Sequence, residues 1–209
     1  MNVAVIGASG RTGRLVVELA LKKGWTVRAL VRDAAKLALN SPLLTVVVGD
    51  ATVEADVAKV LEGTQATINA AGPVKGGHPE LMQRLSKALQ KGFSSTHGHR
   101  IVWLSGAGVK LPGDKPDALR SVVRGLMKLI AASVLRDSEA GVTTILALGD
   151  RVTVVRVPML SDEATKGSLF LSDQPSRPVP AGRSEVAQLL VDQVEDTTWA
   201  GKAPFAGVK

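Results

Sequence analysis

The chain has 209 residues, 45% of them hydrophobic, and this length and composition suit one α/β domain. No apolar run reaches the roughly 18 residues of a membrane-spanning helix, so no membrane partner is expected. Cysteine is absent, which excludes a disulfide framework and a thiolate nucleophile, and no signal-peptide pattern is present, so a cytoplasmic protein is expected. The formal charge is +7, but the basic residues are scattered and tyrosine is absent, so an anionic small-molecule ligand is favoured over a nucleic acid.

The first predicted element is a strand at residues 3–6, which runs into a glycine-rich turn and then a helical pattern at residues 15–20. Gly7 permits the tight turn, Gly10 lets the backbone approach a pyrophosphate, and Gly13 lets the helix pack against the strand. The unpaired N–H groups at the helix start then face the phosphates. A flexible loop is the alternative, but the position after a strand favours a dinucleotide site formed by Gly7, Ser9, Gly10, Arg11, Thr12 and Gly13.

The second predicted strand, residues 26–31, precedes the position that separates NAD sites from NADP sites. NAD-preferring sites place an acidic residue there, about 20 residues past the glycines, to hold the ribose 2′-hydroxyl. This chain has Arg32, with Lys36 one helical turn further on, and Arg11 could reach the same pocket. A guanidinium offers two hydrogen bonds to a 2′-phosphate, so the pattern predicts NADPH over NADH. The alternative is that Arg32 and Lys36 are ordinary surface charges.

Further apolar runs lie at residues 45–48, 66–69, 101–104 and 152–157, with the near-continuous hydrophobicity of parallel strands buried on both faces. Helical patterns lie at residues 81–89, 119–138 and 186–194. The alternation predicts an α/β fold, a Rossmann-type doubly wound parallel sheet in a single domain spanning residues 1–209. Residues 161–182, rich in Pro, Ser, Gly and Asp, are expected to form either a substrate-side loop or a plain connection.

Three other features fit this architecture less directly. The connections at residues 92–100 and 139–151 are longer than the architecture explains. His78, His97 and His99 fall in predicted loops or at a helix start, and the last two lack an acidic neighbour. We therefore expect these histidines on the surface and no metal site.

Several motifs, taken in order, resemble those of one protein family. They are VIGASGRTG at 5–13, LVRD at 30–33, VVVGD at 46–50, VLRDS at 134–138 and PSRPV at 175–179. With these motifs the chain resembles an atypical short-chain dehydrogenase/reductase of the NAD(P)H-binding, NmrA-like group. Within that group it is most similar to biliverdin reductase B-type flavin reductases, which implies a Rossmann fold and an NADP(H) cofactor.

The resemblance also implies cofactor contacts at the ends of later strands. The third strand ends at the position where the family contacts the adenine, and the fourth ends in a sequence similar to the Asn-Asn-Ala-Gly of the superfamily. Small residues there let the backbone run beside the ribose and pyrophosphate, although tight core packing explains them too. The position after the sixth strand lines the nicotinamide. The residues so implied are Asp50, Ala51, Ala71, Gly72, Pro158 and Met159.

The catalytic pattern of the superfamily is not preserved. Its carbonyl reductases use Ser, Tyr and Lys, and this chain has no Tyr. If Lys128 holds the lysine position, Arg124 stands in place of the tyrosine and cannot donate a proton near neutral pH. Ser105 is kept, but Gly106 replaces the second serine often seen there. We therefore expect no carbonyl reduction by the usual triad, leave the catalytic residues unknown, and expect Ser105 and Lys128 to contact the cofactor.

Two functions remain open at this point. One is an NADPH-dependent reductase that donates hydride to a flavin, quinone or tetrapyrrole-like acceptor, which needs no protein-bound acid. The other is a non-catalytic NADP(H)-binding redox sensor of the NmrA-like type. Substrate pockets of this superfamily are built from variable loops, so the residues do not identify the acceptor. The oligomeric state is open, and the resemblance favours a monomer.

Overall fold

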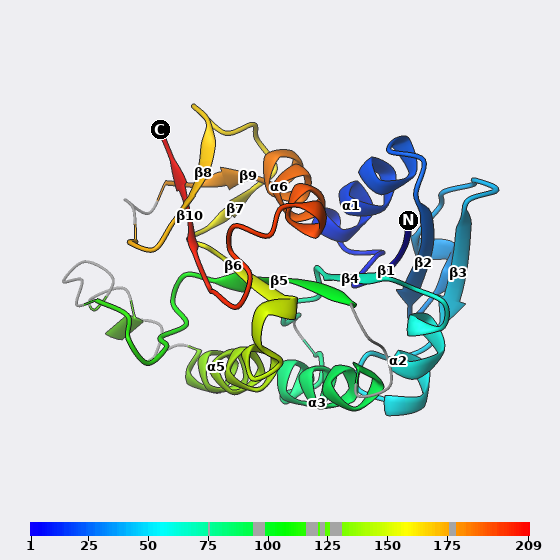
Figure 1. Ribbon diagram of the computed structural model, residues 1–209, viewed down its shortest axis with the longest axis horizontal. Coiled ribbons are helices and arrows are strands. Elements are labelled where there is room, and N and C mark those ends of the chain that lie inside the picture. The colour runs from blue at the N-terminus through cyan, green and yellow to red at the C-terminus, as the bar shows by residue number, and fades with distance from the viewer. Residues whose placement is uncertain (75, 94–98, 116–120, 122–123, 126–130, 176–178) are drawn as a thin grey trace.

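The computed structural model describes residues 1–74, 76–93, 99–115, 121, 124–125, 131–175 and 179–209. Its main feature is an eight-stranded sheet in the order β3-β2-β1-β4-β5-β6-β10-β8 (Figure 1). The strands are β1 (Asn2–Ile6), β2 (Thr26–Val31), β3 (Leu44–Val48), β4 (Ala66–Asn69), β5 (Arg100–Gly106), β6 (Val152–Val157), β8 (Leu169–Ser172) and β10 (Phe205–Val208). All neighbours pair in parallel except β8, which is antiparallel to β10. The predicted doubly wound, mostly parallel sheet is confirmed.

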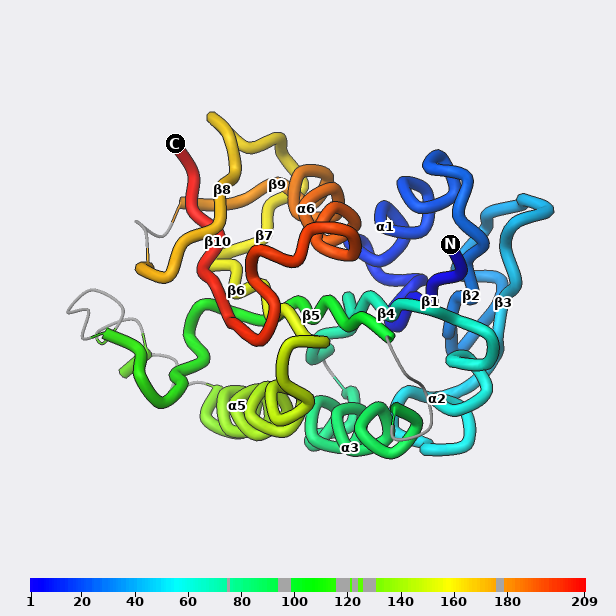
Figure 2. Tube along the Cα trace, in the orientation of Figure 1, coloured from blue at the N-terminus to red at the C-terminus, as the bar shows by residue number. Residues whose placement is uncertain are grey.

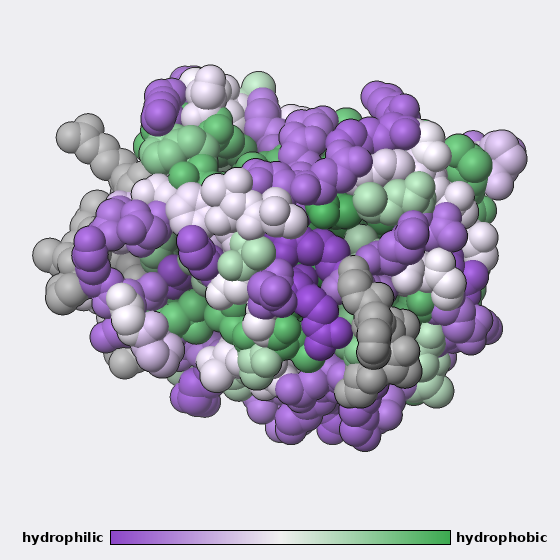
Figure 3. Space-filling view, viewed as in Figure 1, coloured by the Kyte–Doolittle hydropathy of each residue, from purple (hydrophilic) through white to green (hydrophobic). Residues whose placement is uncertain are grey.

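Helices cover both faces of this sheet. Helices α1 (Arg11–Lys22) and α6 (Arg183–Glu195) lie side by side on one face, and α2 (Glu54–Leu61), α3 (Leu81–Phe93) and α5 (Ala132–Leu146) lie on the other (Figures 1 and 2). Because side chains alternate along a strand, Val3 and Val5 of β1 join the core under α1, whereas Ala4 and Ile6 join the core under α3. Hydrophilic residues cover much of the outer surface of these helices (Figure 3).

The order of the strands creates a crevice at one edge of the sheet. From β1 the chain moves outward through β2 and β3, and it then returns to the other side of β1 to form β4. Helices that follow β1 and β4 therefore depart to opposite faces. In open α/β sheets such a reversal opens a ligand-binding crevice at the carboxyl ends of the strands. The site is therefore expected where β1 and β4 end.

The structure corrects several sequence-based boundaries. The six predicted strands are present within two residues at either end. The helix predicted at 119–138 is described as Ala132–Leu146, so most of the unexplained connection at 139–151 is helix, followed by a 3₁₀ turn at Gly149–Arg151. Residues 119–130 lie largely outside the described part, as do residues 94–98 of the other long connection. Helix α2 was not predicted, since eight residues give a weak periodic signal.

The segment at residues 161–182, expected to form either a substrate-side loop or a plain connection, is mostly irregular in its described part but includes strand residues. It contains β8, which pairs with the C-terminal strand β10 at the edge of the main sheet (Figure 2). Its ends belong to a small second sheet formed by β7 (Leu160–Ser161) and β9 (Ala181–Gly182). Antiparallel pairing between β8 and a strand that follows it by more than thirty residues leaves no local pattern in the sequence.

His99 departs from its predicted surface position. Only 3% of its surface is exposed, its ring meets the edge of Phe93, and its Nε2 lies 3.0 Å from the Thr67 hydroxyl. Burial disfavours the charged imidazolium and lowers the pKa of His99 from 6.5 to about 4. His99 is therefore a neutral part of the core.

This burial predicts a pH-dependent stability. Because the folded pKa lies below the unfolded one, the stability from neutral His99 is complete above about pH 6.5 and is lost as the pH falls toward 4. We expect His99 to account for a loss on the order of 2 kcal/mol in the free energy of unfolding across this range. Urea unfolding of wild type and His99→Gln from pH 7.5 to 4 measures it. The wild-type slope should exceed that of the variant, and parallel slopes would contradict the assignment.

Candidate functional site

Two adjoining cavities form a groove along the carboxyl ends of the strands. The first, about 320 Å³, lies at the ends of β1 to β4, and the second, about 500 Å³, lies at the ends of β4 to β6. They share five lining residues, Gly10, Ala70, Ala71, Gly72 and Val74. The groove therefore runs across the crevice where the strand order reverses.

The glycine turn closes tightly over the middle of this groove. Gly7 has a φ of +77°, and a Cβ added to it would lie 2.5 Å from the backbone N of Ala71. A Cβ on Gly13 would lie 2.0 Å from the Gly7 carbonyl oxygen, so α1 packs directly on the turn. Gly10 differs, because its added Cβ would meet only the Gly7 oxygen, at 3.1 Å. Gly13 lines neither cavity, whereas Gly10 lines both.

The start of α1 leaves backbone donors facing the groove. Gly10 is the N-cap residue of α1 and has no side chain to cap the helix. Its carbonyl oxygen accepts a hydrogen bond from the N–H of Arg14 at 2.9 Å. The N–H groups of the first turn have no partner within the helix, and the positive end of the helix dipole lies there. Thr12, which is 5% exposed, lines the second cavity beside this turn. The arrangement suits a phosphate.

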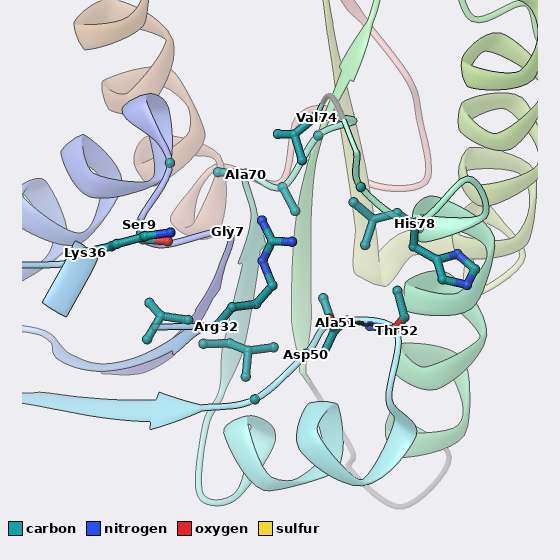
Figure 4. Close-up of a pocket in the computed structure, with 18 residues that line it drawn as sticks. Gly7, Ser9, Arg32, Lys36, Asp50, Ala51, Thr52, Ala70, Val74 and His78 are labelled. Atoms are coloured by element: carbon teal, nitrogen blue, oxygen red, sulfur yellow. Dashed lines mark hydrogen bonds between the residues drawn. The ribbon is translucent and has the colours of Figure 1, made fainter. Parts of the chain in front are cut away.

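Arg32 and Lys36, the two residues predicted to bind the 2′-phosphate, both line the first cavity (Figure 4). The Arg32 side chain rises from the end of β2 into the cavity, and Ser9 lies on the glycine-turn side of it (Figure 4). No hydrogen bond or ion pair within the described residues holds the Arg32 guanidinium. The Lys36 Nζ lies 4.0 Å from Oδ2 of Asp33, which is a long ion-pair contact. Asp33 lines neither cavity, since its carboxylate accepts the N–H of Ala35 at 3.0 Å.

Asp50 and Ala51 line the far wall of the first cavity with Thr52 (Figure 4). The Asp50 carboxylate accepts the backbone N–H and the hydroxyl of Thr52, both at 2.7 Å. These hydrogen bonds hold the pKa of Asp50 below its ordinary value, and the charge of Arg32 adds to this. The N–H of Asp50 is bound by Asp56 of α2 at 2.8 Å, so the unpredicted helix fixes this wall.

The end of β4 forms the ridge between the cavities. Ala71 and Gly72 line both cavities, and the Asn69 side chain fixes this stretch by accepting the N–H of Ala71 at 3.0 Å. Asn69 is fully buried, and its Nδ2 has no hydrogen-bond partner in the described part of the chain. The small side chains let the ridge approach the glycine turn closely. The small residues after β4 therefore pack tightly against the glycine turn and also leave both cavities open to a ligand.

The second cavity is lined mostly by apolar residues, together with a few hydroxyls and the side chains of Arg11 and Arg183. Pro158 and Met159 follow β6 into it, and Met159 is 54% exposed. Ser105, at the end of β5, and Ser138 of α5 also line it. No carboxylate or histidine stands among the described residues that line this cavity.

Arg11 lies elsewhere than expected. It does not line the first cavity with Arg32 but lines the second, where its Nη1 donates to Asp162 at 2.6 Å. The same carboxylate accepts Nε of Arg183 at 2.6 Å. These two contacts hold the pKa of Asp162 below its ordinary value, the one with Arg183 having the larger effect. Asp162 is thus the part of the 161–182 segment that reaches the rim of the site.

Arg124, which stands in place of the superfamily's tyrosine, lies away from both cavities. Arg124 donates to the Gly108 carbonyl and to Glu139, and it lines neither cavity. Glu139 also accepts the N–H of Lys110, so Arg124 ties a loop to α5. Lys128 lies outside the described residues.

Several lining residues were not predicted. Thr52 and His78 face the first cavity, and Ser138 and Arg183 face the second. The Asp-Ala-Thr turn at 50–52 offers a local signal for Thr52. The others come from α5, α6 and the loop after β4, and their sequence patterns do not distinguish them from surface residues.

Two further observations on the described residues concern membrane insertion and metal binding. No helix in the described ranges is long and apolar enough to cross a membrane. Within the same ranges no group of three or more His, Cys, Asp or Glu side chains could hold a metal ion.

Comparisons with known proteins agree with this geometry. A model of the NAD(P)H-binding family matches residues 7–197 of the chain. A short-chain dehydrogenase/reductase from Veillonella parvula, in complex with NADP, has a TM-score of 0.77 at 16% identity, over 99% of this chain and 94% of that one. An oxidoreductase from Lactococcus lactis has a TM-score of 0.75 at 17% identity, over 100% of this chain and 91% of that one. An anaerobillin reductase from Escherichia coli O157:H7 has a TM-score of 0.75 at 17% identity, over 99% of this chain and 96% of that one. At these identities the structures are similar to this chain in fold.

Proposed function

Because this chain belongs to the NAD(P)H-binding family, we propose that it is an NADPH-dependent reductase whose acceptor is a flavin, a quinone or a tetrapyrrole-like compound. The observation that carries the proposal is the groove itself. It joins a basic cavity at the end of β2 to an apolar cavity at the end of β6 through a glycine turn.

The residues of the groove fit a dinucleotide. The absence of a side chain at Gly10 leaves the middle of the groove open, beside the unpaired N–H groups of α1. The adenosine half fits the first cavity, between Arg32 and the Asp50–Thr52 wall, and the nicotinamide half fits the second, beside Pro158 and Met159. The pyrophosphate would then lie at the start of α1. There the positive end of the helix dipole favours its charge, and the glycine lets the backbone approach it closely.

A preference for NADPH follows from the charges at the end of β2. Arg32 and Lys36 face the first cavity, and Asp33, which could hold a ribose hydroxyl, is turned away to bind Ala35. Asp50 does line the cavity, but its carboxylate is held by Thr52. An unpaired guanidinium can form two charged hydrogen bonds to a 2′-phosphate.

The second cavity supports hydride transfer without a protein acid. NADPH held in this groove would supply a hydride, that is two electrons and a proton, to the acceptor and would become NADP⁺, and the second proton would come from water. Ser105 and Ser138 can orient an acceptor carbonyl or ring nitrogen by hydrogen bonding. Arg11 and Arg183 cannot release a proton near neutral pH. The apolar residues exclude water from the faces of the stacked rings.

The choice of acceptor rests on this chemistry and on fold similarity. Flavins and quinones accept hydride at conjugated positions and protonate from solvent, so they need only position and a dry surface. The fold match to an anaerobillin reductase supports a tetrapyrrole-like acceptor as a further member of the class.

The proposal predicts a sharp difference between acceptor types. We expect NADPH oxidation with free FMN or a naphthoquinone, and at least about 100-fold lower kcat/KM with simple aldehydes and ketones, because a positioned general acid typically contributes about 100- to 10,000-fold. Ser105→Ala should lower flavin reduction by less than about tenfold, since the serine orients rather than protonates.

Absorbance at 340 nm measures both reactions. Efficient ketone turnover would contradict the proposed chemistry. Unequal binding of NADPH and NADP⁺ with no turnover of any acceptor would instead favour the non-catalytic redox sensor.

A further inference from the structure

Arg183 presents an unsatisfied guanidinium to the acceptor side of the groove. It is the first residue of α6, its side chain is 12% exposed, and it lines the second cavity. Its Nε donates to Asp162, but Nη1 and Nη2 hydrogen-bond to none of the described residues. Because Arg183 lines an open cavity, these two nitrogens are available to a ligand there.

Arg11 approaches the same place from the neighbouring helix. It is the first residue of α1, which packs beside α6 (Figure 1), and it also lines the second cavity. The two guanidinium groups share one acid, Asp162, through its two different oxygens. This carboxylate is 63% exposed and does not line the cavity, so two positive charges face the cavity and one negative charge lies at its rim.

From this geometry we infer that Arg183, assisted by Arg11, forms an anion subsite that selects acceptors carrying a phosphate or carboxylate group. The inference deepens the proposed function and rests on it. Asp162 already shows the geometry, since one carboxylate bridges both guanidinium groups at 2.6 Å. An anionic group on the acceptor would bind the free Nη donors of Arg183 from the cavity side. Arg183 is therefore a specificity-determining residue, whereas the apolar walls bind the ring system.

The pyrophosphate of the dinucleotide is the other anion that could use these arginines. It lies against the glycine turn and the start of α1, where backbone N–H groups are available. Arg183 belongs to α6 and lines only the second cavity, not the first. We therefore assign it to the acceptor, and the experiment separates the two sources by measuring NADP⁺ affinity as well.

FMN and riboflavin form the matched probe, because they differ only in the 5′-phosphate. Quenching of flavin fluorescence, with the protein saturated by NADP⁺, gives the Kd of each, and steady-state NADPH oxidation gives kcat/KM. We expect FMN to bind about 10- to 100-fold more tightly than riboflavin, as charged hydrogen bonds allow. Arg183→Gln should remove this difference by weakening FMN alone, and Arg183→Lys should restore part of it.

Two further variants test the charge argument. Arg14→Gln is the matched control, because Arg14 is an exposed arginine of α1 paired with Glu18 that lines neither cavity, and it should leave both flavins unchanged. Asp162→Asn removes the competing carboxylate and should tighten FMN by about two- to fivefold. If Asp162 merely held the two helices together, the same substitution would weaken both flavins instead.

The outcomes distinguish this inference from the function on which it rests. Equal affinity for FMN and riboflavin in the wild type, with NADPH oxidation intact, overturns the subsite alone. Loss of NADP⁺ affinity in Arg183→Gln, with the ratio of the two flavins unchanged, assigns Arg183 to the pyrophosphate and also overturns it. Failure of both flavins to bind, together with no turnover of any acceptor, overturns both the subsite and the proposed reductase.

Discussion

Replacing Gly10 with valine is expected to abolish NADPH binding while the protein remains folded. The backbone at Gly10, with φ −74° and ψ 161°, is extended and open to any residue, and its added Cβ would meet only the Gly7 carbonyl oxygen at 3.1 Å. The remaining methyl groups would occupy the part of the groove that both cavities share. Loss of the phosphate contacts to the start of α1 should raise the Kd for NADPH by at least about 100-fold.

Isothermal titration calorimetry measures the affinity, and urea unfolding measures the stability. We expect the free energy of unfolding of Gly10→Val to stay within about 1 kcal/mol of wild type, because the substitution is strained at a single contact. Gly13→Ala is the opposite control, since its Cβ would lie 2.0 Å from the Gly7 oxygen and should destabilise the fold. Normal NADPH affinity in Gly10→Val would show that the glycine turn is not the phosphate cradle.

Replacing Arg32 with alanine is expected to remove the preference for NADPH over NADH. Arg32 faces the first cavity without a hydrogen-bond partner among the described residues, so its donors are available to the 2′-phosphate. Loss of a charged hydrogen-bonded contact should weaken NADPH by about 1.5–3 kcal/mol, or roughly 10- to 150-fold, and should change NADH little. Added salt should reduce the wild-type preference, because part of the contact is exposed.

Calorimetric Kd values for both nucleotides test this expectation. Lys36→Ala should have a smaller effect in the same direction, since the ammonium is an exposed point charge on a flexible stem. Arg14→Ala provides the control for loss of an exposed arginine that lines neither cavity. Equal losses of NADPH and NADH in Arg32→Ala would show that this residue does not contact the 2′-phosphate.

The agreement between sequence and structure is greatest where a signal is local. Apart from β3, the strands from β1 to β6 are short apolar runs that are largely buried on both faces, and this leaves a hydrophobic pattern that is visible without knowing the partner strand. The glycine turn is also largely local, because Gly13 at the start of α1 packs on the Gly7 carbonyl at the end of β1, although Gly7 itself packs on Ala71 after β4. The position of Arg32 followed from the length of one βαβ unit.

The agreement fails where the partner is distant or the element is short. Helix α2 was missed, although its Asp56 fixes the wall of the first cavity through Asp50. His99 was expected on the surface, yet its ring packs against Phe93 at the end of α3. The pairing of β8 with β10 required the C-terminal strand to enter beside β6. In each case the sequence carries the residue but not the neighbour that determines its environment.

The sequence by itself determined the fold class and the family and predicted the glycine turn and the basic residue after β2, because these depend on contiguous patterns: a buried strand, a glycine spacing, and a basic residue at a strand end. Only the tertiary structure decided which charged side chains line the second cavity. Arg11 meets Asp162 across 151 residues and Arg183 meets it across 21, and these contacts move Arg11 from the 2′-phosphate pocket to the second cavity. The direction of a long charged side chain depends on which opposite charge the folded chain brings within reach, and its own neighbours in sequence do not specify that.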